Sequence, residues 1–137
     1  MTAMKTTAKR TPFDPKLPNA AEFTEALGQV TWLMSLSKEH RNRSVAWIEA
    51  HVTAPLMFKQ VRVFTRGKQP LAAIVWAYAT PELKDRIEGN EDFKMDLHDW
   101  RSGSEVVIFD CISPLMEKEM FITKFLVDVR SAQAQNS

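Results

Sequence analysis

The stretch "VRVFTRGKQPLAAIVWAYA", residues 61–79, decides the fold. In "VRVFTR" apolar and polar residues alternate, which is the pattern of a strand with one buried face. "RGKQP" supplies turn residues, and "LAAIVWAYA" is a continuous apolar run, typical of a strand that is buried on both faces. The stretch therefore predicts a β-hairpin whose second strand lies inside a sheet.

Helices are predicted on the N-terminal side of this hairpin. Residues 20–36 place apolar side chains three and four positions apart, which is typical of a helix with one buried face. Residues 35–44 are polar and are expected to leave that helix as a loop. A second helix is expected over residues 45–52, ending before Pro55.

On the C-terminal side of the hairpin the chain returns to helix and then to strand. Thr80 followed by Pro81 is a typical helix start, and this short helix is expected to end before Gly89. "WRSGS" predicts a turn, and "EVVIFDCI", residues 105–112, predicts a further core strand. A closing helix is expected over residues 116–129.

These elements predict the fold class α/β, more closely α+β, with a mostly antiparallel sheet flanked by helices. The length of 137 residues fits one domain. We expect a flexible N-terminal arm over residues 1–18, a single domain over 19–130 and a frayed tail over 131–137. The arm carries lysines but no apolar segment, so a secretory signal is not expected.

The net charge of +1 does not suit a general polyanion binder, and we expect no nucleic-acid partner. The charge is nevertheless unevenly distributed. Residues 38–68 carry seven basic and two acidic side chains, whereas residues 82–99 carry seven acidic and three basic ones. Two solvated faces of opposite charge would explain this pattern, and so would a basic docking surface for an acidic partner.

Several kinds of site are not indicated by the sequence. The single cysteine, Cys111, cannot form an internal disulfide, and its apolar context favours an inert thiol. The four glycines are isolated, so no phosphate-binding loop is indicated, and the three histidines are not spaced for a metal on one helix. No run approaches the roughly 20 apolar residues of a membrane span. We therefore expect no bound metal, no integral membrane segment and a cytoplasmic location.

Three side chains are candidates for chemistry. His40 lies in the polar loop, Ser37 precedes it by three residues, and Asp110 stands in the apolar strand "EVVIFDCI". A histidine can accept a proton near neutral pH, and a carboxylate can orient it and favour its charged form. The residues alone leave open that His40 is a surface residue, Ser37 a helix-terminating residue and Asp110 a strand-end residue.

Three segments carry a resemblance to a known family. They are "LGQVTWLMSLSKEHRN" at 27–42, "PLAAIVWAYAT" at 70–80 and "DWRSGSEVVIFDCISP" at 99–114. Their specific parts are LG-x-V-x-WL, S-x-x-H-R-N, and D-W-x-S-G with an aspartate seven residues after the glycine. In this order and spacing the chain resembles the toxin-activating lysine-acyltransferases, the hemolysin-activating enzymes that act on RTX protoxins.

The resemblance implies a GNAT-like fold, in which a mixed sheet is flanked by helices. It also implies the transfer of a fatty acyl group from acyl carrier protein to internal lysine ε-amines of a protoxin, with no bound cofactor. By motif position, His40 and Asp110 correspond to the family's essential histidine and its aspartate, and Ser37 and Gly103 to its nearby serine and turn glycine. His51 stands where the family often has an asparagine, and it can still hydrogen-bond.

The implied donor, acyl carrier protein, is acidic, so residues 38–68 are the expected docking surface. The side chains assigned to this surface are Arg41, Arg43, Arg62 and Arg66. An apolar groove beside a tryptophan is expected to take the acyl chain, with the core as the alternative place for these rings. The tryptophans considered are Trp32, Trp47 and Trp76.

The chain departs from the family pattern in two further places. "SPLM" at 113–116 replaces the usual "APFG", and the chain ends soon after Val129, so that a distal family arginine has only Arg130 as a counterpart. The resemblance leaves a homodimer open. Two other functions remain as alternatives: a non-catalytic protein-binding module on the same fold, and a GNAT-type transferase that uses an acyl-CoA and a small amine.

Overall fold

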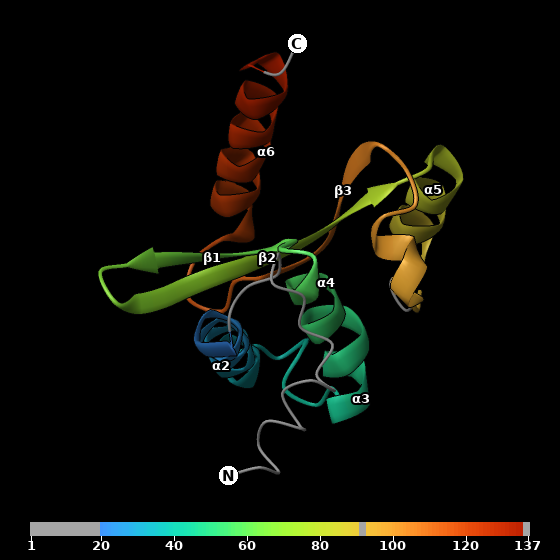
Figure 1. The fold of residues 1–137 in the computed structure, drawn as a ribbon. Coiled ribbons are helices and arrows are strands. Elements are labelled where there is room, and N and C mark those ends of the chain that lie inside the picture. The colour runs from blue at the N-terminus through green and yellow to red at the C-terminus, as the bar shows by residue number, and fades with distance from the viewer. Residues whose placement is uncertain (1–19, 91–92, 136–137) are drawn as a thin grey trace, which may run out of the picture.

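The fold comes from a computed structural model of the chain, which describes residues 20–90 and 93–135. Its centre is an antiparallel sheet in the order β1-β2-β3, formed by Val61–Arg66, Gln69–Ala79 and Glu105–Ile112. Helices cover both faces of this sheet (Figure 1). The predicted α+β class, the hairpin and the third strand are therefore confirmed.

β2 is the central strand, and this position explains its apolar sequence. It pairs with β1 along one edge and with β3 along the other. Ala73 belongs to the core beneath one face of the sheet, whereas Ile74 belongs to the core beneath the other. In the two-residue turn between Arg66 and Gln69, Gly67 has a φ of +60°, which a glycine adopts without steric cost.

Helix α2, Ala20–Leu36, lies against one face of the sheet and has the predicted bounds. Its buried side chains form one core with Ala73 of β2 and Ile112 of β3. They are Phe23, Val30, Leu33 and Met34. This packing fixes the end of α2, and with it the start of the loop that carries the candidate histidine. The predicted arm over residues 1–18 lies outside the described residues.

The next helical segment is longer than predicted. It consists of α3 (Val45–Ile48), a π-helical turn η1 (Glu49–Thr53) and α4 (Ala54–Met57), so the prediction that it ends before Pro55 is wrong. Proline has no N–H to donate and normally interrupts a helix. Here the Ala54 N–H bonds to the carbonyl five residues back, and the proline follows in the first turn of α4. The wider turn therefore accommodates the proline.

Helix α5 and a short 3-10 turn cover the end of the sheet where β2 finishes and β3 begins. α5 spans Pro81–Gly89 and η2 spans Leu97–Trp100, and both contribute to a core with these two strands. The start of α5 is as predicted, because the Thr80 hydroxyl accepts a hydrogen bond from the Leu83 N–H at 3.2 Å.

Helix α6, Lys118–Gln135, lies on the face of the sheet opposite α2 (Figure 1). Phe121 and Phe125 are its buried residues and pack against β2. α6 runs beyond the predicted end at Val129 and into the segment expected to fray. This exposed last part has no apolar periodicity to predict it, but its alanines and glutamines favour helix.

Gly103 is required by a close approach between two segments. The N–H groups of Ser102 and Gly103 both donate to the Tyr78 carbonyl, at 2.8 and 3.0 Å, and this draws the predicted turn against the end of β2. A Cβ at Gly103 would overlap the Ala79 carbonyl and lie 2.5 Å from the Thr80 nitrogen. The glycine therefore anchors the beginning of β3.

Gly103→Ala is expected to lower the free energy of unfolding by about 1–3 kcal/mol, because the overlap is with backbone and cannot be relieved by a rotamer change. Urea denaturation measures this loss. Gly28→Ala is the matched control: an added Cβ meets no atom within 4 Å on the exposed side of α2, so stability should stay equal or rise by up to about 1 kcal/mol. A Gly103→Ala protein as stable as the wild type would contradict the close approach.

Candidate active site

His40 and Asp110, far apart in sequence, are joined by a hydrogen bond, and we call them the dyad. His40 Nε2 lies 2.8 Å from Asp110 Oδ2, and the Ser37 hydroxyl oxygen lies 2.6 Å from His40 Nδ1. His40 is 4% exposed, and Ser37 is also buried, whereas Asp110 is partly exposed. The structure thus brings these three sequence candidates into one chain of hydrogen bonds.

The loop after α2 is a tight turn that keeps Ser37 and His40 side by side. The Ser37 carbonyl accepts hydrogen bonds from the N–H groups of His40 and Arg41, at 3.1 and 2.9 Å. The His40 carbonyl accepts one from the Arg43 N–H at 3.0 Å, and the Ser37 N–H donates to the Met34 carbonyl at 3.0 Å. The turn thus satisfies these backbone groups internally.

A β-bulge in β3 places Asp110 on the same face of the sheet as the histidine loop. Val75 of β2 pairs with Asp110, but the next residue, Trp76, pairs with Ile108, so Phe109 is an extra residue in β3. Ile108 packs toward α6, whereas Phe109 and Asp110 both line a cavity on the other face. Consecutive residues of a regular strand would point to opposite faces. The bulge therefore gives the site two neighbouring side chains.

The hydrogen-bonding roles within the dyad follow from the chemistry of the partners. A carboxylate only accepts hydrogen bonds, so the His40 Nε2–H donates to Asp110. In the neutral ring Nδ1 then carries the lone pair, and it accepts from the Ser37 O–H. The imidazole is held in one tautomer, and the adjacent carboxylate would stabilise the imidazolium formed by protonation at Nδ1.

The dyad opens into a cavity of about 900 Å³, which is the size of a site for a small molecule or cofactor. Aromatic and aliphatic side chains form part of its wall. They are Trp47, Ile87, Phe93 and Phe109. Among the tryptophans considered for an acyl-chain groove, Trp47 lies here, Trp76 packs on Phe125 with ring centroids 4.9 Å apart, and Trp32 is exposed on α2.

His51 is a second buried histidine on the cavity wall, and it lies beside the dyad without joining it. Its Nε2 accepts a hydrogen bond from the Met95 N–H at 3.2 Å. Its ring stacks on Phe109, with centroids 5.0 Å apart, and lies 4.8 Å from the Trp47 ring. His51 therefore ties the segment around Met95 to the strand that carries the dyad aspartate.

Burial lowers the pKa of His51 from its ordinary value of 6.5; the Trp47 carbonyl opposes this shift, and the charges of Arg43 and Lys94 add to it. The unfolded chain then takes up a proton at higher pH than the folded protein does. We therefore expect the free energy of unfolding to fall as the pH drops below about 6.5.

Urea denaturation at about pH 7.5 and about pH 5 tests this dependence. His51→Asn, whose amide can accept the Met95 N–H but does not titrate, should lose less stability between these two pH values than the wild type. Equal losses in the two proteins would show that His51 does not titrate differently on folding.

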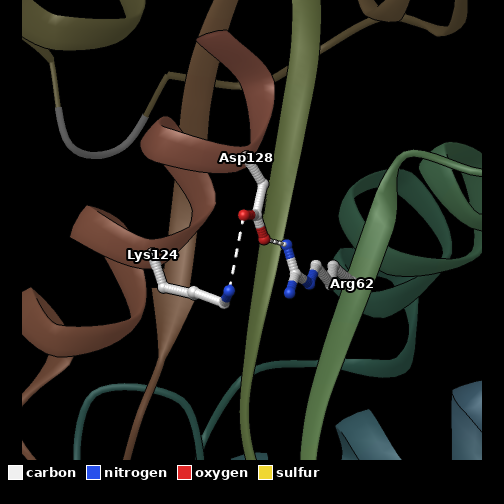
Figure 2. A network of polar contacts seen from close by, with 3 residues as sticks. All are labelled: Arg62, Lys124 and Asp128. Carbon is white, nitrogen blue, oxygen red and sulfur yellow. Dashed lines mark hydrogen bonds and ion pairs between the residues drawn. The ribbon is translucent and has the colours of Figure 1, made fainter. Parts of the chain in front are cut away.

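The four arginines expected to dock a carrier protein do not form one surface. Arg43 lines the cavity, and Arg41 is exposed in the same loop. Arg66 is exposed beside the hairpin turn. Arg62 lies on the side of the sheet that α6 covers, where its guanidinium donates to Asp128 at 2.7 Å (Figure 2).

The ion pair of Arg62 holds α6 to the sheet. Figure 2 shows Asp128 between Arg62 of β1 and Lys124, which lies one helical turn earlier in α6. The distance from Lys124 Nζ to Asp128 Oδ1 is 3.4 Å. The hydrogen bond from Arg62, together with Lys124, lowers the pKa of the Asp128 carboxyl. Arg62 is thus engaged within the fold and lies away from the dyad.

The structure also adds residues that the sequence did not single out. Phe109, Lys94 and Lys118 all lie on the cavity wall. Phe109 looks like any core residue of an apolar strand, and the two lysines belong to segments without a motif. Burial raises the pKa of the Cys111 thiol to about 11, with the neighbouring Asp110 adding to the shift, which fits the inert thiol expected there.

Residues 20–90 and 93–135 lack two further features. Within these ranges no helix has both the length and the apolar character needed to cross a membrane. The same residues contain no cluster of three or more histidine, cysteine or acidic side chains that could hold a metal ion.

The fold and the site define an α+β protein in which a buried histidine, hydrogen-bonded to a partly exposed aspartate, lines a cavity with aromatic and charged side chains. Residues 19–135 match the RTX toxin acyltransferase family, and the chain belongs to this family. The resemblance read from the three sequence motifs is therefore confirmed.

Curated relatives agree with this assignment. The RTX-II toxin-activating lysine-acyltransferase ApxIIC of Actinobacillus pleuropneumoniae is 30% identical over 95 residues, which are 69% of this chain and 58% of that protein. The protein-lysine myristoyltransferase HlyC of Escherichia coli is 31% identical over 90 residues, 66% of this chain and 52% of that protein. The matched part of the chain thus spans between 52% and 58% of the length of these relatives.

Proposed function

We propose that this protein is a cytoplasmic acyltransferase that moves a fatty acyl group from acyl carrier protein to internal lysine ε-amines of an RTX-type protoxin. The observation that carries the proposal is the hydrogen-bonded dyad at the cavity. The relatives support the choice of substrates, since one is named a toxin-activating lysine-acyltransferase and another a protein-lysine myristoyltransferase.

The reaction needs a base because the acceptor lysine is protonated at neutral pH. With a pKa near 10.4, only roughly 0.04% of lysine side chains are neutral at pH 7. The ammonium ion first loses one proton to solvent. As the neutral amine nitrogen then attacks the thioester carbonyl, His40 accepts at Nδ1 the proton that this nitrogen must shed, and Asp110 stabilises the resulting imidazolium at Nε2. The tetrahedral intermediate then breaks its C–S bond. The imidazolium returns the proton to the thiolate, which leaves an amide and a free thiol.

In this mechanism Ser37 is a positioning residue for His40. Its hydroxyl donates to Nδ1, the nitrogen that must accept the proton, so the proton reaches His40 through this hydroxyl or after the hydroxyl has rotated aside. The side chain is buried and is not among the residues that line the cavity. This placement supports a relay or an orienting role over a serine nucleophile.

The buried dyad also favours an enzyme over a non-catalytic binding module. A docking surface has no need of a desolvated imidazole whose two ring nitrogens are both hydrogen-bonded. The partly exposed Asp110 beside it lines a cavity of about 900 Å³, not a flat surface.

Intact-mass analysis tests the proposal. The full chain is mixed with acyl-loaded carrier protein and an RTX-type protoxin fragment, and peptide mapping then locates any added mass. We expect the mass of one acyl group on a lysine of the fragment, and none with a His40→Ala protein that folds normally.

The other outcomes separate the alternatives. Binding of the carrier without transfer by the wild-type protein would support the binding module. Transfer from an acyl-CoA to a small amine, with none from the carrier protein, would support the second type of transferase.

A further inference from the structure

Three cationic side chains from separate parts of the chain line the cavity of the dyad. Arg43 comes from the loop after α2, Lys94 from the segment before η2, and Lys118 from the start of α6. Two carboxylates, Glu39 and Asp110, face the same cavity, and that of Asp110 is engaged in the dyad. Within the described ranges none of the three cations has an ion-pair partner. The three exposed cations give this wall an excess of positive charge, which would favour an anionic ligand.

We propose that Arg43, Lys94 and Lys118 form a subsite for the phosphate of the phosphopantetheine arm on which the acyl donor is carried. This inference rests on the proposed function, which supplies the thioester donor. It adds the chemical group by which the cavity recognises that donor and the residues that bind it.

Two of the cations are placed as an anion site requires. The Arg43 guanidinium lies over the Trp47 ring, 4.9 Å from its centroid, which restricts the side chain and leaves its N–H groups available. Lys118 is the first residue of the 18-residue helix α6, where the helix terminus already carries partial positive charge. A cation there is unfavourable in the free protein, and a bound phosphate would reverse that effect.

The charge pattern fits the donor and not the acceptor. The acceptor lysine approaches as an ammonium ion, which three like charges repel. A phosphodiester is negative throughout the neutral range and is attracted by the same charges. The phosphate therefore occupies the cationic wall, and the arm extends through the cavity to present its thioester at His40.

Titration calorimetry with 4′-phosphopantetheine and with pantetheine tests the subsite directly, because the two ligands differ only by the phosphate. With the full chain, we expect phosphopantetheine to bind roughly tenfold or more tightly, the effect of one or more charge-assisted contacts. The difference should shrink as salt is added. Equal affinities, or no binding of either ligand, would overturn the proposal.

Variants then identify the residues. The double variant Arg43→Gln/Lys118→Gln should bring the two dissociation constants to within about twofold of each other. The matched control, Lys38→Gln/Arg41→Gln, removes the same charge from exposed positions outside the cavity wall and should keep the full difference. An equal loss in the control would assign the effect to overall charge and contradict the subsite. Circular dichroism verifies that each protein is folded.

Coenzyme A, titrated as a third ligand, distinguishes a carrier-bound arm from the free coenzyme. Tighter binding of coenzyme A than of phosphopantetheine, lost in Arg43→Gln/Lys118→Gln, would assign the subsite to the free coenzyme and overturn this proposal. The experiments can also refute the phosphate subsite and the proposed acyltransferase function independently of each other. Transfer from the carrier protein without a phosphate preference refutes the subsite alone, and a phosphate preference without any transfer refutes the proposed function alone.

Discussion

A His40→Gln protein is expected to transfer acyl groups about 10²–10⁴ times more slowly than the wild type, because it lacks the proposed base for the amine proton. Glutamine retains polar atoms that can hydrogen-bond to Ser37 and Asp110 but has no titratable group. The rate of amide formation is measured by mass spectrometry on a protoxin-derived peptide with saturating acyl carrier protein. The loss should appear in kcat and leave the KM for the donor nearly unchanged.

Ser37→Ala provides the comparison, since it removes the hydroxyl from Nδ1 and leaves the imidazole and Asp110 in place. We expect a reduction of roughly tenfold or less, as for a residue that orients the base. A loss as large as that of His40→Gln, together with an acyl group trapped on Ser37 in the wild type, would instead make the serine a nucleophile. A His40→Gln protein with the wild-type rate would remove the dyad from the mechanism.

Asp110→Asn is expected to lower kcat by about 10⁴-fold. The amide carries no charge to stabilise the imidazolium, and its NH₂ group can donate to Nε2 and so shift the ring proton to Nδ1, where the amine proton must go. The measurement is the same peptide assay, in which the loss should appear in kcat.

Asp128→Asn is the matched control for this substitution. It makes the same change in a carboxylate that pairs with Arg62 on the other side of the sheet (Figure 2), so the rate should stay within about twofold of the wild type. Equal effects of the two substitutions would mean that the loss came from destabilisation, and the role given to Asp110 would be wrong.

Much of the fold could be predicted because its periodic elements are buried on a regular pattern. α2 matches its predicted bounds, since four inward residues at helical spacing face the sheet. β2 could be read from its apolar run, which its central position explains. The apolar periodicity did not predict two helix ends. A π-helical turn continues the helical segment past Pro55, and the exposed end of α6 has no regular spacing of apolar residues.

The site could be predicted only in part, and mostly from the family motifs. Nothing in the residues alone says that a loop histidine and a strand aspartate 70 positions away will meet. The basic composition of residues 38–68 suggested one docking surface, yet Arg62 faces α6 because side chains alternate along β1. Lys94 and Lys118 reach the cavity through the tertiary fold, which their local sequence does not show.

The seven-residue spacing between Gly103 and Asp110 includes Phe109, the extra residue of the bulge in β3. Between the pairs Ala79–Glu105 and Val75–Asp110, β3 advances one residue more than β2 does. A homologue with one residue fewer in this interval could keep the carboxylate on the same face of a regular strand and lose only the aromatic neighbour that stacks on His51. Sequence searches that insist on seven residues would overlook such a homologue.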